Sequence, residues 1–573
     1  MSNKEEFVFK RTNPNNSSIR IANLIINDKI YLCNIWREVD LGSNLRWNEN
    51  PFKDNSWQLY YHSLRMISFL VNAFEINYKL IYLKKAKWFI ESWWSINSNK
   101  KSSVNRYAWN DHGTANRLIN LIYFWTFYKK SPLYDDKFKE KFMLILKKHG
   151  EFLSNEKNYS KYNHGIFQDK ALLEMSVLFP ELDKDKKWFN KSINRLLNRL
   201  YEDITESGVH KEHSPEYQIT VLRLFTTIKE FMDFYELKVL ELDKILYKMQ
   251  EYLSYILQDN NYVPMIGDTR AKISIGSIRS SIINQHLMYV VTNGEKGIKH
   301  ENNSKVYKDG GIGIYKNNYE KENLYLFFTA AFHSTTHKHA DDLSFILNIN
   351  KTGYFVDGGT YNYQKNDIYR DYFRSVFAHN TVSVDDVSYE IAKYQKNKAK
   401  IKDFEITQEY KYVTGIHTLY KGIVIKRTLI CLNDNTIFVH DEIISNNKHK
   451  YSQIFNVGKD VNVIIKDKNN ILLESMIEDS KIELIQLDKV SDIERFSGSI
   501  KPVRAWQSFY HNEKHPINSL VFNKYGKNIE FKTLITINPK NKLLNVKINR
   551  VSDKYIYIFY YENGEKKSIE IKI

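Results

Sequence analysis

Hydrophobic positions in the first half of the chain recur at the spacing of an α-helix. One stripe follows the pattern i, i+4, i+7, i+11 and i+14 at Val221, Phe225, Ile228, Met232 and Tyr235. A second stripe repeats it at Phe189, Ile193, Leu196, Leu197 and Leu200. Residues from about 55 to 295 therefore predict a series of helices. Periodicity alone does not separate a bundle, an array and a toroid of such helices.

The pattern changes from helical to alternating after a polar, glycine-containing stretch at residues 296–311. Apolar and polar positions alternate around residues 343–349, and TIFVHDEI and KSIEIKI continue this strand-like pattern towards the end. We therefore predict an N-terminal extension at 1–54, a helical domain at 55–300 and an antiparallel β-sandwich domain at 301–573.

Composition and charge narrow the class of partner. The chain has 573 residues, of which 42% are hydrophobic and 26% charged, which is typical of a globular protein. Its formal net charge of +17 favours an anionic partner, such as nucleic acid, anionic lipid or an acidic glycan. The aromatic residues fall in core stripes and no nucleic-acid recognition motif occurs, so we expect no nucleic-acid partner.

The cysteines and the apolar segments of the chain lead to expectations about disulfides, bound zinc and cellular location. Cys33 and Cys431 are the two cysteines, and neither belongs to a short metal-binding pair, so we expect neither a disulfide framework nor cysteine-bound zinc. We also expect no transmembrane segment, because no run of about eighteen apolar residues occurs. No stretch resembles a signal peptide. We therefore expect a cytoplasmic protein, or a periplasmic or secreted one if the N-terminus is incomplete.

The densest group of side chains with catalytic potential is FHSTTHKHADDLSF, residues 332–345. On an extended strand, His337 and His339 would point to one face, and His333 has the same parity. Neighbouring imidazoles can bind a metal or divide the roles of base and ligand. The alternative interpretation is a solvated strand without chemistry.

A second set of metal-ligand types follows downstream. His339, Asp357 in YFVDGGTY and His379 in FAHNTVSVDD would make a two-histidine, one-carboxylate site suited to zinc. Ligands so far apart in sequence have no diagnostic interval, so spacing alone does not decide between a metal site and unrelated residues.

Three polar patches interrupt the helical half. WNDHGTANR contains His112 and Arg117, and KYNHGIFQDKALLE contains Asn163 and His164. The third patch, GVHKEHSPEYQ, contributes His210, Glu212, His213 and Tyr217. Each patch stands near a predicted helix start, where polar side chains also serve as caps.

These segments, taken in order, resemble one known family. NHGIFQDKALLEMSVLFP, EHSPEYQ, HKHADDLSF, YFVDGGTYNY, RDYFRSVFAHNTVSVDD and WQSFY occur in the order found in heparinase II/III-like proteins, over roughly residues 55–520. The resemblance implies an incomplete (α/α) toroid followed by an antiparallel β-sandwich. It also implies a polysaccharide lyase that cleaves uronate-containing anionic polysaccharides by β-elimination, in some relatives within a bacterial capsule or exopolysaccharide pathway.

The resemblance also implies roles for individual residues. Asn163, with His164 beside it, would face the uronate carboxylate, and Tyr217 and His337 would be the catalytic tyrosine and histidine. The implied metal ligands, for a zinc ion with a structural or orienting role, are His339, Asp357 and His379. The predicted substrate-binding residues are His112, Arg117, Glu212, His213, Arg270, Arg370 and Arg374. One departure is Gln218, which stands where many relatives have a histidine.

Elimination would proceed by proton transfers between these groups and the sugar. Tyr217 would protonate the departing C4 oxygen, and His337 would serve as base when the C5 proton lies on the opposite face. Two other functions stay open. A glycoside hydrolase would need paired carboxylates, for which Glu212 with Glu216 and Asp341 with Asp342 are available. A glycan-binding or assembly protein would need no catalytic set.

Overall fold

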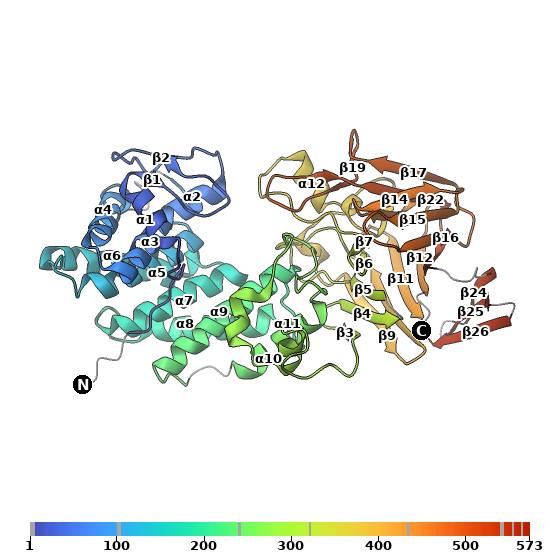
Figure 1. The fold of residues 1–573 in the computed structure, drawn as a ribbon, viewed down its shortest axis with the longest axis horizontal. Coiled ribbons are helices and arrows are strands. Elements are labelled where there is room, and N and C mark those ends of the chain that lie inside the picture. The colour runs from blue at the N-terminus through green and yellow to red at the C-terminus, as the bar shows by residue number, and fades with distance from the viewer. Residues whose placement is uncertain are drawn as a thin grey trace. The chain divides into compact units, whose positions relative to one another are not determined.

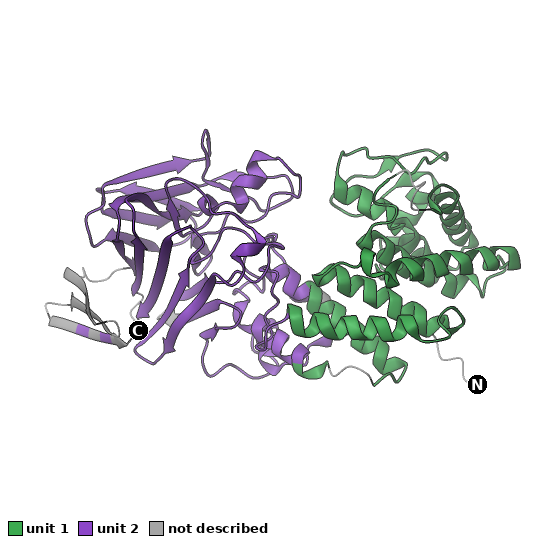
Figure 2. Cartoon of the chain, turned by 180° about the vertical axis from the view of Figure 1, so that it is seen from behind, with its two compact units in different colours: residues 1–203, 220–244 green, residues 204–219, 245–573 purple. Residues whose placement is uncertain are grey.

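A computed structural model describes residues 6–99, 105–238, 242–319, 322–432, 436–538, 544–552, 555–562 and 565–572. The chain divides into two compact units, residues 1–203 with 220–244 (unit 1) and residues 204–219 with 245–573 (unit 2) (Figure 2). Helices give way to strands between residues 291 and 305 (Figure 1). The predicted domain boundary at residue 300 stays a prediction, because the compact units divide the chain at other positions.

Helices occupy the N-terminal part of the chain, as the periodicity predicts. They are α1 (Ser18–Ile26), α2 (Asn55–His62), α3 (Arg65–Asn77), α4 (Leu80–Asn97), α5 (Asp111–Tyr128), α6 (Asp136–Ser154), α7 (Tyr162–Leu178), α8 (Lys187–Asp203), α9 (Pro215–Phe234), α10 (Asp243–Ile256), α11 (Gln285–Val291) and, later, α12 (Ile368–Arg374). Both predicted stripes are confirmed, since α8 buries Ile193 and Leu196 and α9 buries Val221 and Phe225. Within the described ranges, no helix is both long and apolar enough to cross a bilayer.

Unit 1 is built around helices that are buried on every side. Almost all residues of α5 from 113 to 125 and of α7 from 163 to 176 are inaccessible to solvent, and α5 packs against α3 and α7. The predicted N-terminal extension also contributes to this unit, because α1 packs on α3 through Ile21, Ala22 and Ile25.

Unit 2 contains two large antiparallel sheets. The eight-stranded sheet has the order β14 (Val461–Ile465), β15 (Asn470–Ser475), β16 (Lys481–Gln486), β23 (Ile529–Ile537), β12 (Thr436–Ser445), β11 (Ile423–Leu432), β10 (Tyr410–His417) and β9 (Ala399–Ile406). The nine-stranded sheet has the order β17 (Asp492–Ser497), β22 (Asn518–Gly526), β13 (His449–Val457), β7 (Thr352–Phe355), β6 (Phe345–Ile349), β5 (Glu322–Thr329), β4 (Ile312–Tyr319) and β3 (Lys305–Tyr307), with β8 (Val382–Val384) paired to β13.

Smaller sheets complete the set of strands. They are β1 (Lys29–Ile30) with β2 (Val39–Asp40), β18 (Ser499–Ile500) with β19 (Val503–Arg504), β20 (Trp506–Gln507) with β21 (His515–Pro516), and β24 (Leu544–Ser552), β25 (Tyr555–Glu562) and β26 (Glu565–Lys572). The two large sheets share one hydrophobic core, to which strands of both contribute Leu347, Phe355, Leu429, Val439, Phe455, Phe522 and Phe531. Alternating burial along β9, β14 and β16 matches the predicted strand pattern.

A buried ion pair ties the eight-stranded sheet to the loops that carry the histidines. Arg427 of β11 donates to both carboxylate oxygens of Asp441 on β12, at 2.6 and 2.8 Å. Its remaining donor group reaches the carbonyl oxygens of Leu343 and Asn380. Leu343 lies near the end of the histidine-rich segment 332–345, and Asn380 directly follows His379. The guanidinium therefore fixes both segments against the core.

We predict that Arg427→Met lowers the free energy of unfolding of unit 2 by about 3–5 kcal/mol, because it leaves the Asp441 carboxylate buried without its partner. Thermal unfolding of the full chain measures the loss. Lys426→Met is the matched control: it breaks the neighbouring pair with Glu442 (2.7 Å), which points to the other face of the same strands. We expect a smaller loss there, because Lys426 and Glu442 both keep some contact with solvent. Equal losses of stability for the two variants would contradict the special structural role of the Arg427–Asp441 pair.

Candidate active site and metal site

The histidine-rich segment is an irregular loop between β5 and β6, so the prediction of an extended strand was wrong. His337 has a φ of 53°, in the left-handed region, which breaks any strand at that point. His337 and His339 nevertheless converge, because His337 Nδ1 lies 2.8 Å and His339 Nε2 3.0 Å from the two oxygens of Asp268. His333 points elsewhere and stacks on His213 instead.

Asp268 is a buried carboxylate that is shared by the two histidines. Thr360 Oγ1 also donates to it, at 3.2 Å. Burial alone would raise the pKa of Asp268, but the hydrogen bonds to both imidazoles outweigh it and hold that pKa well below its usual range. Burial alone would likewise lower the pKa of His337, but the hydrogen bond and charge of Asp268 raise it. Each partner thus favours the charged form of the other.

Tyr217 lies face to face with His337. The ring centroids are 3.6 Å apart and the planes 20° from parallel, and the Tyr217 hydroxyl lies 3.5 Å from that of Tyr363. Burial is the main reason that the pKa of Tyr217 is raised, so the phenol keeps its proton at neutral pH. Tyr217 is the third residue of α9, which begins at Pro215, a residue favoured at the first helical position.

His213 positions the loop rather than presenting a reactive group. Its Nε2 accepts hydrogen bonds from the backbone N–H groups of His333 (3.1 Å) and Ser334 (3.2 Å). Burial lowers its pKa well below the usual value, so the imidazole is neutral and can accept these bonds. The predicted substrate contact of His213 stays a prediction, but this nitrogen is already engaged.

Gln218 has a comparable structural role. Its side-chain oxygen accepts from the backbone N–H of His210 at 2.7 Å, and its Nε2 donates to the carbonyl of Gly208 at 2.9 Å. It therefore holds the turn that precedes α9. The exchange of a histidine for Gln218 affects this turn rather than the Tyr217–His337 contact.

The carboxylates available to a hydrolase are engaged in other contacts. Glu216 forms a bidentate ion pair with Arg270, and Asp341 and Asp342 both bind the buried ammonium of Lys338. Glu212 is fully buried, with one oxygen 3.9 Å from His210 Nδ1. Arg270, predicted to bind substrate, is thus paired with Glu216.

The three predicted metal ligands converge. One ligand atom from each of His339, Asp357 and His379 lies within 4.8 Å of the others, and all three residues are buried. His379 Nδ1 lies 2.7 Å from Asp357 Oδ2. His339 Nδ1 and His379 Nε2 are buried without a hydrogen-bond partner among the described residues. Two orphaned imidazole nitrogens beside a carboxylate fit the donor set that zinc prefers.

The predicted arginines of α12 contact the backbone around this cluster. Arg370 Nε donates to the carbonyl of Asn362 at 3.1 Å, and Arg374 donates to that of Lys338 at 3.4 Å. Burial, and then the charge of Arg370, lower the pKa of Arg374. Neither residue forms an ion pair with a carboxylate among the described residues.

Unit 1 holds the remaining predicted residues. Asn163, the second residue of α7, is 6% exposed, and its side-chain amide is hydrogen-bonded to no other described residue. His164 Nδ1 lies 2.9 Å from Asp111 Oδ2, and its ring meets that of His112 edge-on at 4.6 Å. Because Asn163 and His164 belong to unit 1 and Tyr217 to unit 2, a site shared by all of them stays a prediction.

Arg117 is placed in the core of unit 1. It is fully buried, stacks on Trp93 at 3.9 Å, and donates to His149 Nε2 (2.8 Å) and to the carbonyl of His62 (2.6 Å). These contacts occupy the guanidinium within the fold. They argue for a structural role instead of the predicted contact with substrate.

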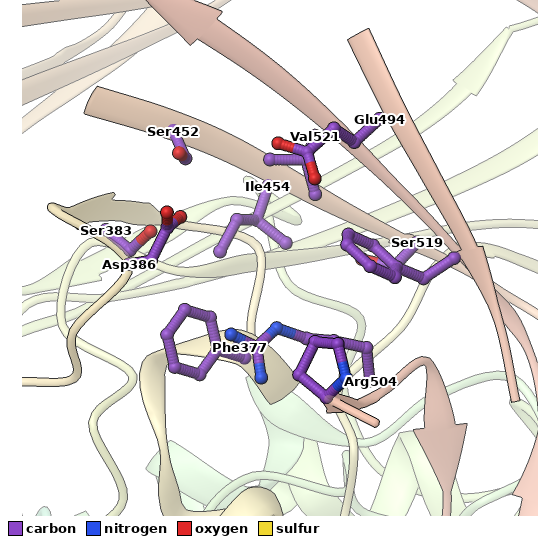
Figure 3. A pocket seen from close by; sticks show the side chains of 11 residues that line it. Phe377, Ser383, Asp386, Ser452, Ile454, Glu494, Arg504, Ser519 and Val521 are labelled. Carbon is purple, nitrogen blue, oxygen red and sulfur yellow. The ribbon is translucent and has the colours of Figure 1, made fainter. Parts of the chain in front are cut away.

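A separate cavity of about 370 Å³ in unit 2 contains none of the predicted residues (Figure 3). The Arg504 guanidinium lies over the Phe377 ring at 3.3 Å in its wall. The acidic groups of the wall, Asp386 and Glu494, each lie 3.1 Å from Lys450 Nζ. Positive and negative groups balance here, so this cavity has no preference for a polyanion.

Comparison with known proteins identifies the family. The family model of the heparinase II/III N-terminus matches residues 3–293, and that of the heparinase II/III-like C-terminal region matches residues 299–538. The chain belongs to the heparinase II/III family. Among its relatives, a heparin-sulfate lyase of Pedobacter heparinus is 21% identical over 77% of this chain and 70% of its own length. A heparin-sulfate lyase of Bacteroides thetaiotaomicron is 21% identical over 81% of this chain and 74% of its own.

Solved structures of family members share the fold. A heparinase III structure has a TM-score of 0.83 at 17% identity, over 100% of this chain and 93% of that chain. The heparan sulfate lyase of Pedobacter heparinus has a TM-score of 0.73 at 17% identity, over 98% and 90%. The predicted fold class, a toroid of helices followed by an antiparallel β-sandwich, is thus confirmed.

Sequence reasoning missed Asp268, Tyr363 and Gly267. The signal for Asp268 was the short polar sequence Gly-Asp-Thr-Arg, in which only the predicted Arg270 drew attention. Gly267 has a φ of 55°, and a Cβ there would lie 2.5 Å from the carbonyl oxygen of His213 and 2.8 Å from that of His337. Only glycine allows the backbone at position 267 to approach both carbonyl groups this closely.

We predict that Gly267→Ala destabilises unit 2 through both backbone strain and overlap with the carbonyls of His213 and His337. Gly422→Ala is the matched control, because Gly422 has a φ of 75° and a methyl group added there would meet nothing within 4 Å. Both variants incur the left-handed penalty, about 1–2 kcal/mol. The overlap should add about 1–3 kcal/mol at Gly267. Thermal unfolding compares them, and equal midpoints would show that the close approach does not constrain the site.

Proposed function

We propose that this protein is a polysaccharide lyase that cleaves a uronate-containing anionic polysaccharide by β-elimination. The observation that carries the proposal is the face-to-face contact of Tyr217 with His337, whose Nδ1 is held by the Asp268 carboxylate. The names of the lyase relatives support a glycosaminoglycan as substrate. The same proposal includes a role in a bacterial capsule or exopolysaccharide pathway, as the sequence resemblance implies.

In this reaction the C5–H and C4–O bonds break and a C4=C5 double bond forms. The C5 proton is too weakly acidic for a side-chain base until the adjacent carboxylate charge is stabilised. Asn163 would supply that stabilisation with its otherwise unengaged amide, an effect worth about 3–4 kcal/mol per donor. His164 would add a second polar contact.

The two aromatic groups would carry the proton transfers. The Tyr217 phenol keeps its proton at neutral pH and would donate it to the departing C4 oxygen. His337 has its Nδ1 on Asp268, and its Nε2 is bonded to no described residue. In the neutral imidazole, with the proton on Nδ1, Nε2 would take the C5 proton when that proton lies opposite the leaving group. Asp268 fixes the imidazole orientation in the way that a carboxylate orients a catalytic histidine.

The alternative of a glycoside hydrolase is less well supported. Hydrolysis requires one carboxylic acid and one carboxylate on either side of the bond. Glu216 is engaged by Arg270, and Lys338 neutralises Asp341 and Asp342. These pairs leave no matched acid and base among the carboxylates that sequence analysis offered.

The proposal includes a divalent metal, zinc by its donor set, at His339, Asp357 and His379. When bound, the ion would supply a structural tie between the loops that carry these residues. The ligand His339 also bonds Asp268 through Nε2, so the ligand set and His337 share one carboxylate. An orienting role follows from this connection.

We predict that the protein releases products with the ultraviolet absorbance of an unsaturated uronate from at least one member of a panel of uronate polysaccharides. On that substrate, Tyr217→Phe should reduce turnover by about 10²- to 10⁴-fold, because it removes the proton donor while keeping the ring that packs on His337. Initial rates and thermal unfolding together measure catalysis and folding.

Tyr363→Phe is the matched control, since it removes the neighbouring hydroxyl, 3.5 Å away. It should reduce turnover by less than about tenfold. Near-normal rates for Tyr217→Phe would refute its role as the acid, and reducing-end release without absorbance would identify a hydrolase.

We also predict that the purified protein contains about one zinc ion per chain, bound by two imidazoles and a carboxylate. His339→Ala and His379→Ala should lose the ion and unfold at lower temperature. His333→Ala should retain it, because His333 stacks on His213 in the same loop but outside the ligand set. Elemental analysis of the variants decides the question, and active protein that is free of transition metal would remove zinc from the proposal.

A further inference from the structure

Three arginines of unit 1 are close enough for their side-chain charges to repel one another. Arg11 belongs to the N-terminal segment, Arg65 begins α3 and Arg223 lies on α9. The Arg11 guanidinium stands over the Phe167 ring at 5.1 Å, and that of Arg65 over Tyr60 at 4.7 Å. Burial, and then the charge of Arg65, lower the pKa of both Arg11 and Arg223. The fold thus holds like charges together.

The N-terminal segment fixes Arg11 in this position. On one side, the backbone N–H of Phe9 donates to Glu174 Oε1 at 2.6 Å, and Lys10 pairs with Glu75 at 2.8 Å. On the other side, the hydroxyl groups of Thr12 and Ser68 lie 2.6 Å apart. Arg11 is held between these anchors, so its place beside Arg65 is built into the fold.

These arginines lack the carboxylate partners that other arginines of unit 1 have. Arg195 pairs with Glu156 and Asp169, and Arg199 pairs with Asp203. Among the described residues, Arg11, Arg65 and Arg223 form no ion pair and no hydrogen bond, and Nε of Arg65 is buried without an acceptor. Arginine does not lose its proton in proteins, so the neighbouring guanidiniums repel one another. The repulsion is screened least at the partly buried Arg11 and Arg65 and most at the exposed Arg223. An anionic ligand would offset that repulsion.

The cluster adjoins the residues proposed to contact the uronate. The Phe167 ring beneath Arg11 also contacts the His112 ring, at 4.5 Å, and His112 meets His164 at 4.6 Å. Phe167 follows His164 by one turn of α7. The Nδ1 of His112 is buried without a hydrogen-bond partner among the described residues, which adds a second unengaged polar group at this place.

We propose that Arg11, Arg65 and Arg223 form a subsite that binds a carboxylate or sulfate group of the glycan, near the sugar that Asn163 contacts. This subsite rests on the proposed function, because it assigns how the substrate is held. The planar guanidinium offers paired donors that match the oxygens of either anion. Phe167 and Tyr60 support two of these groups from below and restrict water on that face.

Binding measurements on the full-length chain test the subsite. Calorimetry with a sulfated heparin oligosaccharide and with an unsulfated uronate oligosaccharide is compared for Arg11→Gln, Arg65→Gln and Arg223→Gln. Each loss of a charge-assisted hydrogen bond should weaken binding by about 10- to 100-fold. Arg65→Lys should recover part of the loss, because it restores charge without the planar fork. Arg46→Gln, at an exposed arginine of the same unit, should bind like the parent.

Thermal unfolding without ligand separates binding from a structural role. Removal of one like charge should leave the unfolding temperature unchanged or raise it, because repulsion is relieved. Weaker binding without destabilisation supports the subsite. A larger loss of affinity for the sulfated oligosaccharide identifies sulfate as the bound group, and an equal loss for both oligosaccharides identifies the carboxylate. Parental affinity for both oligosaccharides in all three variants, or weaker binding together with a lower unfolding temperature, overturns the subsite.

The same variants distinguish this proposal from the proposed function. If the three variants bind weakly but the parent releases no unsaturated product from any glycan, the proposed subsite is supported and the proposed lyase activity is refuted. If all three variants form product with the parental KM, the proposed lyase activity is supported and the proposed subsite is refuted.

Discussion

The carboxylate of Asp268 is the interaction on which the arrangement of the site in unit 2 depends. It contacts His337 on one oxygen and His339 on the other, and thereby joins the histidine stacked on Tyr217 to the cluster of His339, Asp357 and His379. The loop that carries both histidines has no regular secondary structure of its own. Its geometry therefore rests on side-chain contacts and on Gly267, whose missing side chain lets the carbonyl groups of His213 and His337 both approach its backbone.

The same contacts explain why the pKa values of two histidines of one site are shifted in opposite directions. His213 has backbone N–H groups as partners, so burial dominates and its pKa falls. His337 is also buried, but the ionised carboxylate of Asp268 outweighs desolvation and raises its pKa. Partner identity, rather than exposure, decides the direction in which the pKa of a buried imidazole shifts. A neutral acceptor suits the residue that holds the loop, and a carboxylate-oriented imidazole suits the residue beside Tyr217.

Local pattern predicted most of the fold, and several residues that it named converge in the structure, but it did not predict how those residues meet. The apolar stripes of α8 and α9 and the alternation in β9 and β14 reflect burial along one element, which a sequence records directly. The strand predicted for His337 and His339 failed because a left-handed residue and a distant carboxylate determine that loop. Asp268, Arg11 and Arg223 were missed for the same reason: their importance comes from neighbours that are remote in sequence.

The charges of the two units are organised differently, and the difference bears on the choice between elimination and hydrolysis. In unit 2, Lys338 neutralises Asp341 and Asp342 and Arg270 pairs with Glu216, so none of these carboxylates is free to act as an acid or a base beside a sugar bond. In unit 1, Arg11, Arg65 and Arg223 are cations without a carboxylate partner among the described residues. Elimination from a uronate needs stabilised negative charge and two proton-transfer groups instead of paired carboxylates. The distribution of charge therefore favours a lyase independently of the family relationship.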